Sequence, residues 1–254
     1  MAVWIIILLG VVQGLTEFLP VSSSGHLVLL EKYFDIDCNT TLTNVVLHFG
    51  TLVAVCIYYR KKLLQLVKHP LSNQTLYLIV ATIPAVVFVL LFNTFVDTNM
   101  NNTLFVGIGF IVSAILLLVA ENISKRTHNF APVNQKSSLM MGVAQALAIF
   151  PGLSRSGSTL AFGLLSGVQK EEALDFSFLM SIPIILGSLV YELTNVEAFV
   201  TMSANDVLVL AMGATIAALT AILSINLMQC IIKKMKLWYF VPYLIMLGTI
   251  VIVL

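Results

Sequence analysis

The sequence predicts an all-α integral membrane protein, with six transmembrane helices and two re-entrant helical hairpins in an inverted-topology repeat. Three observations predict this fold. Apolar residues make up 59% of the 254 residues and charged residues only 10%, which is outside the range of soluble proteins. Six long stretches are apolar, and two further apolar stretches are interrupted by polar residues. These two interrupted stretches are similar in sequence, so we expect residues 1–254 to form one membrane domain.

A helix needs about 20 apolar residues to cross the hydrocarbon core of a bilayer. Six stretches approach or exceed this length. The first of them is short, so we expect it to extend into Leu63 and Leu64. The predicted spans are Val45–Tyr59, Leu76–Val96, Thr103–Ala120, Phe176–Tyr191, Val207–Ile232 and Leu237–Leu254.

Two further apolar stretches, Met1–Leu30 and Leu139–Val168, are interrupted near the middle by serine, proline and charged residues. Each half is about 10–12 residues long, which is too short to cross the bilayer alone. Irregular backbone at membrane depth is tolerated only where protein or water satisfies its polar groups. We therefore expect both stretches to enter and leave the membrane on the same side, as hairpins with polar tips.

The positions of lysine and arginine set the expected orientation, because cytoplasmic loops are enriched in both. With six crossings and two re-entrant hairpins, only Lys32 lies on the wrong side, and the loops Asp97–Asn102 and Glu192–Asp206 contain neither residue. Both termini are then predicted on the outer face of the plasma membrane. The basic residues placed inside are Arg60, Lys61, Lys62, Lys68, Lys125, Arg126, Lys136, Lys170, Lys233, Lys234 and Lys236.

The two hairpins are copies of one sequence. A shift of 132 residues aligns Gly10–Gly25 with Gly142–Gly157 without gaps, and eight of the sixteen positions are identical. Three predicted crossings separate the copies, so the second copy, 139–254, is inverted relative to the first, 1–120. Half-helix ends of such repeats meet near the bilayer midplane and form a binding site. The identical pairs are Gly10/Gly142, Val11/Val143, Gln13/Gln145, Leu15/Leu147, Phe18/Phe150, Ser22/Ser154, Ser24/Ser156 and Gly25/Gly157.

The first hairpin tip carries Glu17, Ser22, Ser23, Ser24 and His26 within ten residues. A carboxylate, hydroxyl groups and an imidazole so close together are suited to nucleophilic and acid–base chemistry. We therefore expect the first tip to supply the reacting groups.

The second tip is cationic and rich in hydroxyl groups and glycine: Gly152, Ser154, Arg155, Ser156 and Thr159. The arginine fork matches phosphate oxygens, and glycines let backbone N–H groups approach an anion at a helix N-terminus. Together the tips predict a phosphate or diphosphate site, with a lipid tail lying in the bilayer beside the hairpins. The near-neutral net charge of +1 gives no sign of a nucleic-acid partner.

Each of these residues also has a purely structural interpretation. Serines in apolar helices often only bond backbone carbonyls or help helices to pack, and Ser24 and Ser156 fit this best because each precedes a glycine. Glu17 and Arg155 could form a structural ion pair, but ionisable residues inside a membrane are costly and usually functional. His26 is open to both readings.

Several other polar residues are expected to be structural. His48 lies inside a predicted span and could be a satisfied buried histidine or a functional one. Glu121, with Lys125 and Arg126, is expected to form a solvated helix end. Asp175, near a helix start, is expected to be a cap or a strut.

With these residues in view, the sequence resembles the undecaprenyl-diphosphatase family, also called bacitracin-resistance proteins, over nearly its whole length. Two motifs carry the resemblance: Gln13–His26, which reads QGLTEFLPVSSSGH, and Pro151–Thr159, which reads PGLSRSGST. The stretch Phe176–Pro183 is also similar to the family. The first motif opens with Gln13 where many members have Glu. This weakens any mechanism in which two carboxylates hold a divalent metal, because a neutral amide is a poorer ligand for a hard cation.

The resemblance implies hydrolysis of undecaprenyl diphosphate to the monophosphate, at a site open to the outer face, which recycles the carrier lipid of cell-wall synthesis. On this hypothesis Ser23 is the nucleophile or a phosphate-positioning group, and Glu17 and His26 handle protons. Arg155 clamps the diphosphate and neutralises developing charge. Direct attack by water stays open. The expected substrate-binding residues are Gln13, Ser22, Gly152, Ser154, Ser156 and Thr159.

Magnesium or calcium is the expected cofactor, and no organic cofactor is expected. Glu17 with Gln13 is the candidate metal site, although the sequence contains no complete metal cage. The expected partners are the polyprenyl diphosphate lipid and the bilayer, and a homodimer stays open.

Two other functions compete with this hypothesis. A transporter or flippase of a polyprenyl phosphate lipid would share the inverted repeat, but pure transport would not need a Ser/His/Glu cluster opposite an arginine. A second lipid phosphatase superfamily uses Ser-Gly-His and a later Ser-Arg box with a nucleophilic histidine. Ser24-Gly25-His26 and Ser154-Arg155 imitate these fragments, but no histidine follows His128, which excludes that superfamily.

Overall fold

The computed structural model describes residues 3–36, 40–99, 102–126, 130–193, 203–234 and 236–253. In these ranges the regular secondary structure is helical, apart from one isolated bridge between Ala131 and Val168. The predicted all-α class is confirmed. Residues 100–101 and 194–202 of the two predicted outer loops, and also His128, lie outside the described residues.

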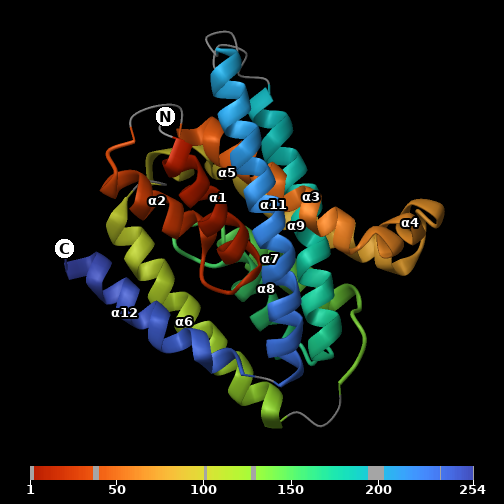
Figure 1. Ribbon diagram of the computed structural model, residues 1–254. Coiled ribbons are helices and arrows are strands. Elements are labelled where there is room, and N and C mark those ends of the chain that lie inside the picture. The colour runs from red at the N-terminus through yellow and green to blue at the C-terminus, as the bar shows by residue number, and fades with distance from the viewer. Residues whose placement is uncertain are drawn as a thin grey trace.

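Figure 1 shows the helices, labelled in chain order. They are α1 (Val3–Phe18), α2 (Ser23–Tyr33), α3 (Thr40–Tyr58), α4 (Arg60–Lys68), α5 (Asn73–Asn99), α6 (Thr103–Arg126), α7 (Gln135–Leu147), α8 (Arg155–Leu165), α9 (Lys170–Leu193), α11 (Ala204–Lys233), the 3-10 turn η1 (Leu237–Tyr239) and α12 (Phe240–Val253).

Four helices, α5, α6, α9 and α11, are long and apolar enough to cross a membrane. A fifth span results if α3 and α4 are counted together, although they are bent by 78°. Helix α1 and the segment Leu237–Val253 are apolar but shorter. By length and composition, the described chain therefore has four or five membrane-crossing helices, as expected of a multi-pass membrane protein.

The first predicted span does not continue straight into Leu63 and Leu64. The chain bends at Tyr59, and α4 projects from the bundle with none of its residues buried (Figure 1). Arg60 and Lys61 open this helix, and charged residues are costly in hydrocarbon, so the chain turns away there. Helix α3 instead gains its length at its other end, by starting at Thr40.

The two hairpins pack in equivalent ways. Helix α1 lies along α11 of the second repeat, and α7 lies along α5 of the first. A Cβ added to Gly10 would lie 2.7 Å from the carbonyl oxygen of Gly213, and one added to Gly142 would lie 2.5 Å from that of Ala81. The partners Ala81 and Gly213 are themselves 132 residues apart. The spacing of the sequence repeat is thus reproduced in the helix packing.

A second symmetric contact joins α6 to α12, which lie side by side in Figure 1. Each helix has a glycine at the crossing. A Cβ on Gly107 would lie 3.0 Å from the carbonyl oxygen of Gly248, and one on Gly248 would lie 2.8 Å from that of Gly107. Small residues at such crossings let membrane helices approach closely.

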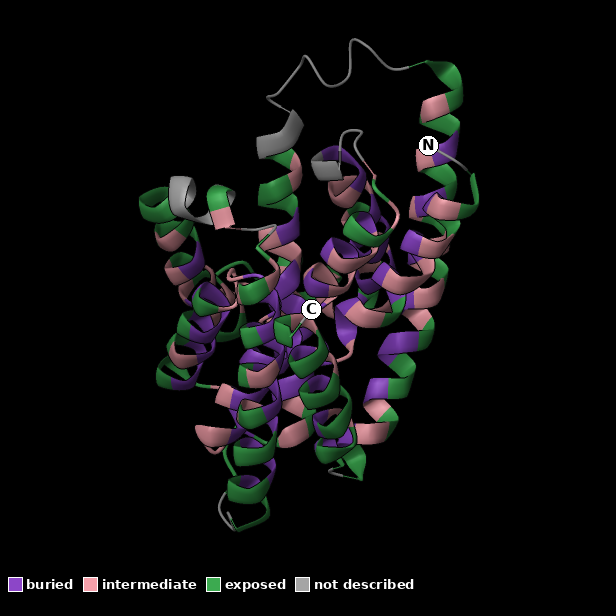
Figure 2. Ribbon diagram, turned by 90° about the vertical axis from the view of Figure 1, so that its left-hand side faces the viewer, coloured by how far each residue is buried: buried purple, intermediate pink, exposed green. Residues whose placement is uncertain are grey.

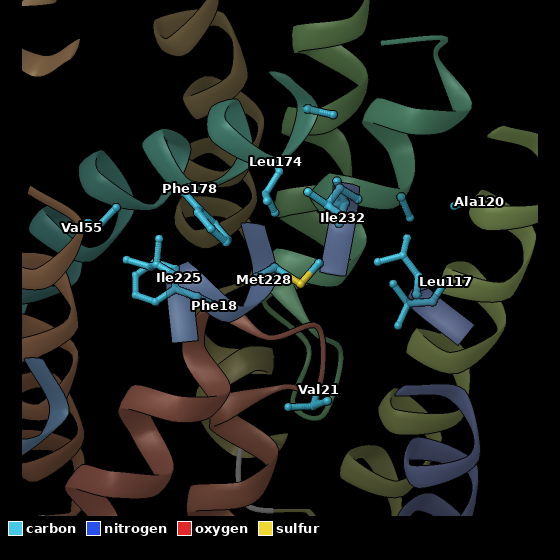
Figure 3. Close-up of a cluster of buried hydrophobic side chains, with 14 of the residues drawn as sticks. Phe18, Val21, Val55, Leu117, Ala120, Leu174, Phe178, Ile225, Met228 and Ile232 are labelled. Carbon is cyan, nitrogen blue, oxygen red and sulfur yellow. The ribbon is translucent and has the colours of Figure 1, made fainter. Parts of the chain in front are cut away.

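The largest apolar cluster surrounds the turn between α1 and α2, at the tip of the first hairpin. Phe18 of α1 meets Phe178 of α9 edge-to-face, with ring centroids 5.0 Å apart, and Ile225 of α11 belongs to the same cluster (Figure 3). Figure 2 shows buried positions on the inner helix faces and exposed positions on the outer faces. Many exposed side chains are apolar, including Leu90 and Leu219, as expected of a surface in contact with lipid.

Two carboxylates, the partly buried Asp175 and the buried Glu121, join helices away from the hairpin tips. Asp175 of α9 accepts hydrogen bonds from Tyr59 (2.6 Å) and Gln229 (2.7 Å) and pairs with Lys62, so the predicted strut is confirmed. The prediction that Glu121 is solvated is wrong. Its side chain is buried, pairs with Lys125 and accepts the backbone N–H of Trp238 at 2.7 Å, because η1 folds back over the end of α6.

Candidate active site

The tips of the two hairpins are capped in the same way and lie against each other. Ser22 accepts the backbone N–H of Gly25 at the start of α2 (3.4 Å), and Ser154 accepts that of Gly157 at the start of α8 (3.1 Å). Both are N-cap serines, whose hydroxyl oxygen satisfies a free helix N–H group. Ser156 also donates to the carbonyl oxygen of Leu19 at 3.0 Å, which joins the second tip to the first.

An ion pair between Glu17 and Arg155 lies where the tips meet. Glu17 lies in the last turn of α1 and Arg155 is the first residue of α8. Arg155 Nη2 donates to Glu17 Oε1. The Glu17 side chain is 5% exposed and the Arg155 side chain 16%. The sequence prediction that the two motifs meet at one site therefore holds for this pair, and the contact links the two repeats.

The other carboxylate oxygen of Glu17 accepts two further hydrogen bonds. Ser23 Oγ donates to Oε2 at 2.6 Å, and Gln13 Nε2 donates to the same atom at 3.0 Å. Ser23 occupies the first turn of α2 and is partly exposed, whereas Gln13 is fully buried. The carboxylate therefore orients the hydroxyl of Ser23 and is itself held by α1, α2 and α8.

Arg155 is anchored from behind by α9. Its Nη1 lies 3.5 Å from the carbonyl oxygen of Ser177, and the Ser177 hydroxyl is 2.6 Å from that of Thr159. Thr159 also donates to the carbonyl oxygen of Arg155 at 2.8 Å and is fully buried. Thr159 thus lies behind the arginine, and its predicted contact with substrate stays a prediction. Ser177 was missed in the sequence, although it lies in the family-like stretch Phe176–Pro183.

Gly152 has a demanding backbone position. Its φ of +79° lies in the left-handed region that favours glycine, and a Cβ there would lie 2.1 Å from the carbonyl oxygen of Val106. The backbone conformation and the close approach to α6 are enough to explain the glycine. Its predicted role in phosphate binding stays a prediction.

His26, the imidazole selected from the sequence, contacts α12 and α6. Its Nδ1 lies 2.7 Å from the carbonyl oxygen of Ser22 and its Nε2 lies 2.5 Å from the hydroxyl of Tyr243. The ring stacks on Tyr243 and meets Phe110 edge-on. No hydrogen bond within the described residues joins it to the Glu17 cluster, so its role in proton handling stays a prediction.

A different histidine lies beside Glu17. His48 Nε2 of α3 is 3.5 Å from Glu17 Oε2, and the His48 side chain is 28% exposed. From the sequence, His48 was one ionisable residue inside an apolar span, with nothing to relate it to α1. The cost of an ionisable group at that depth was the only signal that could have selected it.

The predicted metal site of Glu17 and Gln13 does not fit a resident cation. Both Glu17 oxygens already accept protein donors, and the Arg155 guanidinium would oppose a second positive charge. Of the Glu17 and Gln13 oxygens, Gln13 Oε1 is the one buried without a hydrogen-bond partner in the described part of the chain. No group of three or more His, Cys, Asp or Glu side chains within the described ranges could hold a metal.

Comparison with known proteins agrees with the motifs. The model of the bacitracin resistance protein BacA family matches residues 6–250. An undecaprenyl-diphosphatase of Carboxydothermus hydrogenoformans is 38% identical over 252 residues, covering 98% of this chain and 95% of the relative. Undecaprenyl-diphosphatase 3 of Bacillus cereus is 37% identical over 247 residues, covering 97% of this chain and 95% of the relative. An undecaprenyl-diphosphatase of Thermosipho melanesiensis is 41% identical over 197 residues, covering 75% and 78%. The chain belongs to the bacitracin resistance protein BacA family.

Proposed function

We propose that this chain hydrolyses undecaprenyl diphosphate to undecaprenyl phosphate and inorganic phosphate, which recycles the cell-wall carrier lipid and confers bacitracin resistance. The relatives named undecaprenyl-diphosphatase support the substrate and the reaction. The observation that carries the proposal is the cluster of Ser23, Glu17 and Arg155 at the junction of the hairpins, because it combines a hydroxyl nucleophile, a base and an anion clamp.

In this mechanism the terminal phosphate binds to the exposed edge of Arg155, close to the N-terminus of α8. The positive end of the helix dipole favours an anion there. Arg155 then neutralises charge that develops on the phosphoryl oxygens. The carbonyl oxygen of Ser177 helps to hold the guanidinium in place.

Ser23 is the proposed nucleophile. Its oxygen attacks the terminal phosphorus while its proton passes to Glu17, the anhydride bond breaks, and undecaprenyl phosphate leaves with the bonding electrons. Water then attacks the phosphoserine, the P–Oγ bond breaks, and Ser23 recovers a proton as phosphate departs. The 2.6 Å hydrogen bond from Ser23 to Glu17 supports this assignment. Direct attack by water would leave no phosphoserine, so trapping separates the two routes.

We also propose the finer topology of six crossings and two re-entrant hairpins, with both termini and the site on the outer face. The equivalent packing of α1 on α11 and α7 on α5 supports the inverted repeat. In cells whose native cysteines are replaced, an impermeant thiol reagent should label Val3→Cys from outside, and Lys234→Cys only after permeabilisation. The opposite pattern would refute the orientation.

Magnesium or calcium stays in the proposal as a cation that enters with the diphosphate, since the Glu17 cluster does not fit a resident metal. Magnesium in particular is often bound mainly through substrate phosphates. Such a cation would neutralise phosphate charge alongside Arg155.

Phosphate release from undecaprenyl diphosphate by the purified protein in detergent tests the function. We expect hydrolysis by the unmodified protein and a loss of at least about 1,000-fold in Glu17→Ala, each measured with and without divalent cations. No gradient exists in detergent, so release there cannot come from transport. Absence of release from the unmodified protein would refute the proposed function, and equal release by both proteins would refute the role of Glu17.

A further inference from the structure

Two histidines of the described chain share one local arrangement. His26 Nδ1 and His48 Nδ1 each lie 2.7 Å from the carbonyl oxygen four residues earlier, Ser22 and Asn44. A carbonyl oxygen only accepts hydrogen bonds, so Nδ1 carries the proton in both rings. The second nitrogen, Nε2, is then the acceptor of a neutral ring, and its neighbour decides what the ring can do.

The two Nε2 atoms face opposite kinds of neighbour. At His26 the neighbour is the Tyr243 hydroxyl, which can donate, so the neutral ring is satisfied on both sides. At His48 the neighbour is Glu17 Oε2, a carboxylate oxygen that cannot donate unless it is protonated. Two acceptors 3.5 Å apart repel each other unless a proton lies between them. The His48–Glu17 contact therefore requires one proton, whereas the His26–Tyr243 contact does not.

The surroundings place that proton on His48. Glu17 already accepts hydrogen bonds from Arg155, Ser23 and Gln13, which stabilise its ionised form. Helix α9 also packs on α3 and carries the carboxylate of Asp175. That carboxylate is paired with Lys62 and Tyr59 at the far end of α3, so it does not compete for the proton. The described part of α11 has no charged residue between Asp206 and Lys233.

We propose that His48 is a positioning residue of this site, donating from Nε2 to Glu17 so that the carboxylate stays turned toward Ser23 and Arg155. The α3 contact completes the set of helices around Glu17, since Gln13 comes from α1, Ser23 from α2 and Arg155 from α8. Without it, Oε2 loses the donor that the described part of α3 supplies. This inference rests on the proposed function, because the consequence of positioning Glu17 is the attack by Ser23.

A matched pair of amide variants tests the proposal. In His48→Gln the side-chain N–H₂ can reach the place of Nε2 and donate to Glu17. In His48→Asn the shorter amide reaches only the place of Nδ1. Both variants remain polar and remove the ring, so only the reach to Glu17 differs between them.

We expect His48→Asn to lower kcat for undecaprenyl diphosphate about 10- to 100-fold, the size expected for losing one hydrogen bond to a charged group. His48→Gln should stay within about threefold of the unmodified protein. KM should change little in either variant, because the phosphate clamp Arg155 is untouched. Thr51→Val, one turn further along α3 and bonded to the His48 carbonyl oxygen rather than to Glu17, serves as the control with unchanged kcat.

The outcomes separate two kinds of failure. Equal kcat in the Gln and Asn variants, whether both high or both low, would refute the positioning role while leaving the phosphatase intact. Thermal midpoints in detergent show whether a low value reflects unfolding, and the Gln variant alone then decides, since an amide donor should preserve activity. Absence of phosphate release from the unmodified protein would refute the proposed function, and the role of His48 with it.

Discussion

The two hairpins, α1–α2 and α7–α8, are copies with one scaffold and two chemistries. Where the copies agree, the residues hold the structure: Ser22 and Ser154 cap the second helix of each hairpin, and Gly10 and Gly142 seat the first helix on its partner. Where they differ, the residues carry reactive groups. Ser23 and Arg155 occupy the same repeat position, yet one is the proposed nucleophile and the other the proposed clamp.

The second hairpin has no carboxylate at the position of Glu17, and its equivalent glutamine lacks the partner that Gln13 has. In the first copy, Gln13 donates to Glu17. In the second, Ile149 occupies the position of Glu17, and both amide atoms of the buried Gln145 lack a hydrogen-bond partner within the described chain. The hydroxyl of Ser158, which occupies the position of His26, likewise lacks one. The comparison indicates that the acid–base site formed in one copy only.

After Glu17→Ala, the largest effect that separates the copies is expected from Arg155→Lys. Lysine keeps the charge but loses the planar fork that pairs with phosphate oxygens and reaches both Glu17 and Ser177. We expect kcat for phosphate release to fall about 100- to 1,000-fold, the size reported for removing one transition-state donor. A rate equal to that of the unmodified protein would show that any cation suffices and that the second hairpin supplies only charge.

Substitution of the packing glycines should destabilise the protein equally in the two hairpins. We expect Gly10→Ala and Gly142→Ala each to lower the free energy of unfolding by about 1–3 kcal/mol, because the added Cβ meets backbone carbonyl oxygens that cannot move aside. Thermal unfolding in detergent measures both. The control is Gly187→Ala, where a Cβ meets nothing within 4 Å, and its thermal midpoint should not fall. Destabilisation of only one hairpin would show that the packing is less symmetric than the sequence repeat.

Much of the arrangement of the hairpins and their polar residues could be predicted, because it depends on local sequence patterns. The repeat predicted that the two tips meet at one site, and the cost of charge in hydrocarbon selected Glu17 and Arg155 as members of it. The capping roles of Ser22 and Ser154, which were predicted to bind substrate, come from the structure. The contact of His48 with Glu17 could not be predicted in this way, since it depends on how α3 packs against α1. The prediction that Glu121 is solvated failed for the same reason, because its backbone partner comes from η1, more than 100 residues later in the chain.

The smallest effect concerns the two capping serines. Ser22→Ala and Ser154→Ala each remove a hydroxyl that accepts a helix N–H group, which costs about 1 kcal/mol of stability. The loss should be larger for Ser154, because its hydrogen bond to Gly157 is 3.1 Å long whereas that of Ser22 to Gly25 is 3.4 Å. Chemical denaturation in detergent would measure the two differences. A larger loss at Ser22 would mean that this serine, with its φ of 68°, holds the first tip by more than its cap, and the division between shared scaffold and separate chemistry would then fail at that position.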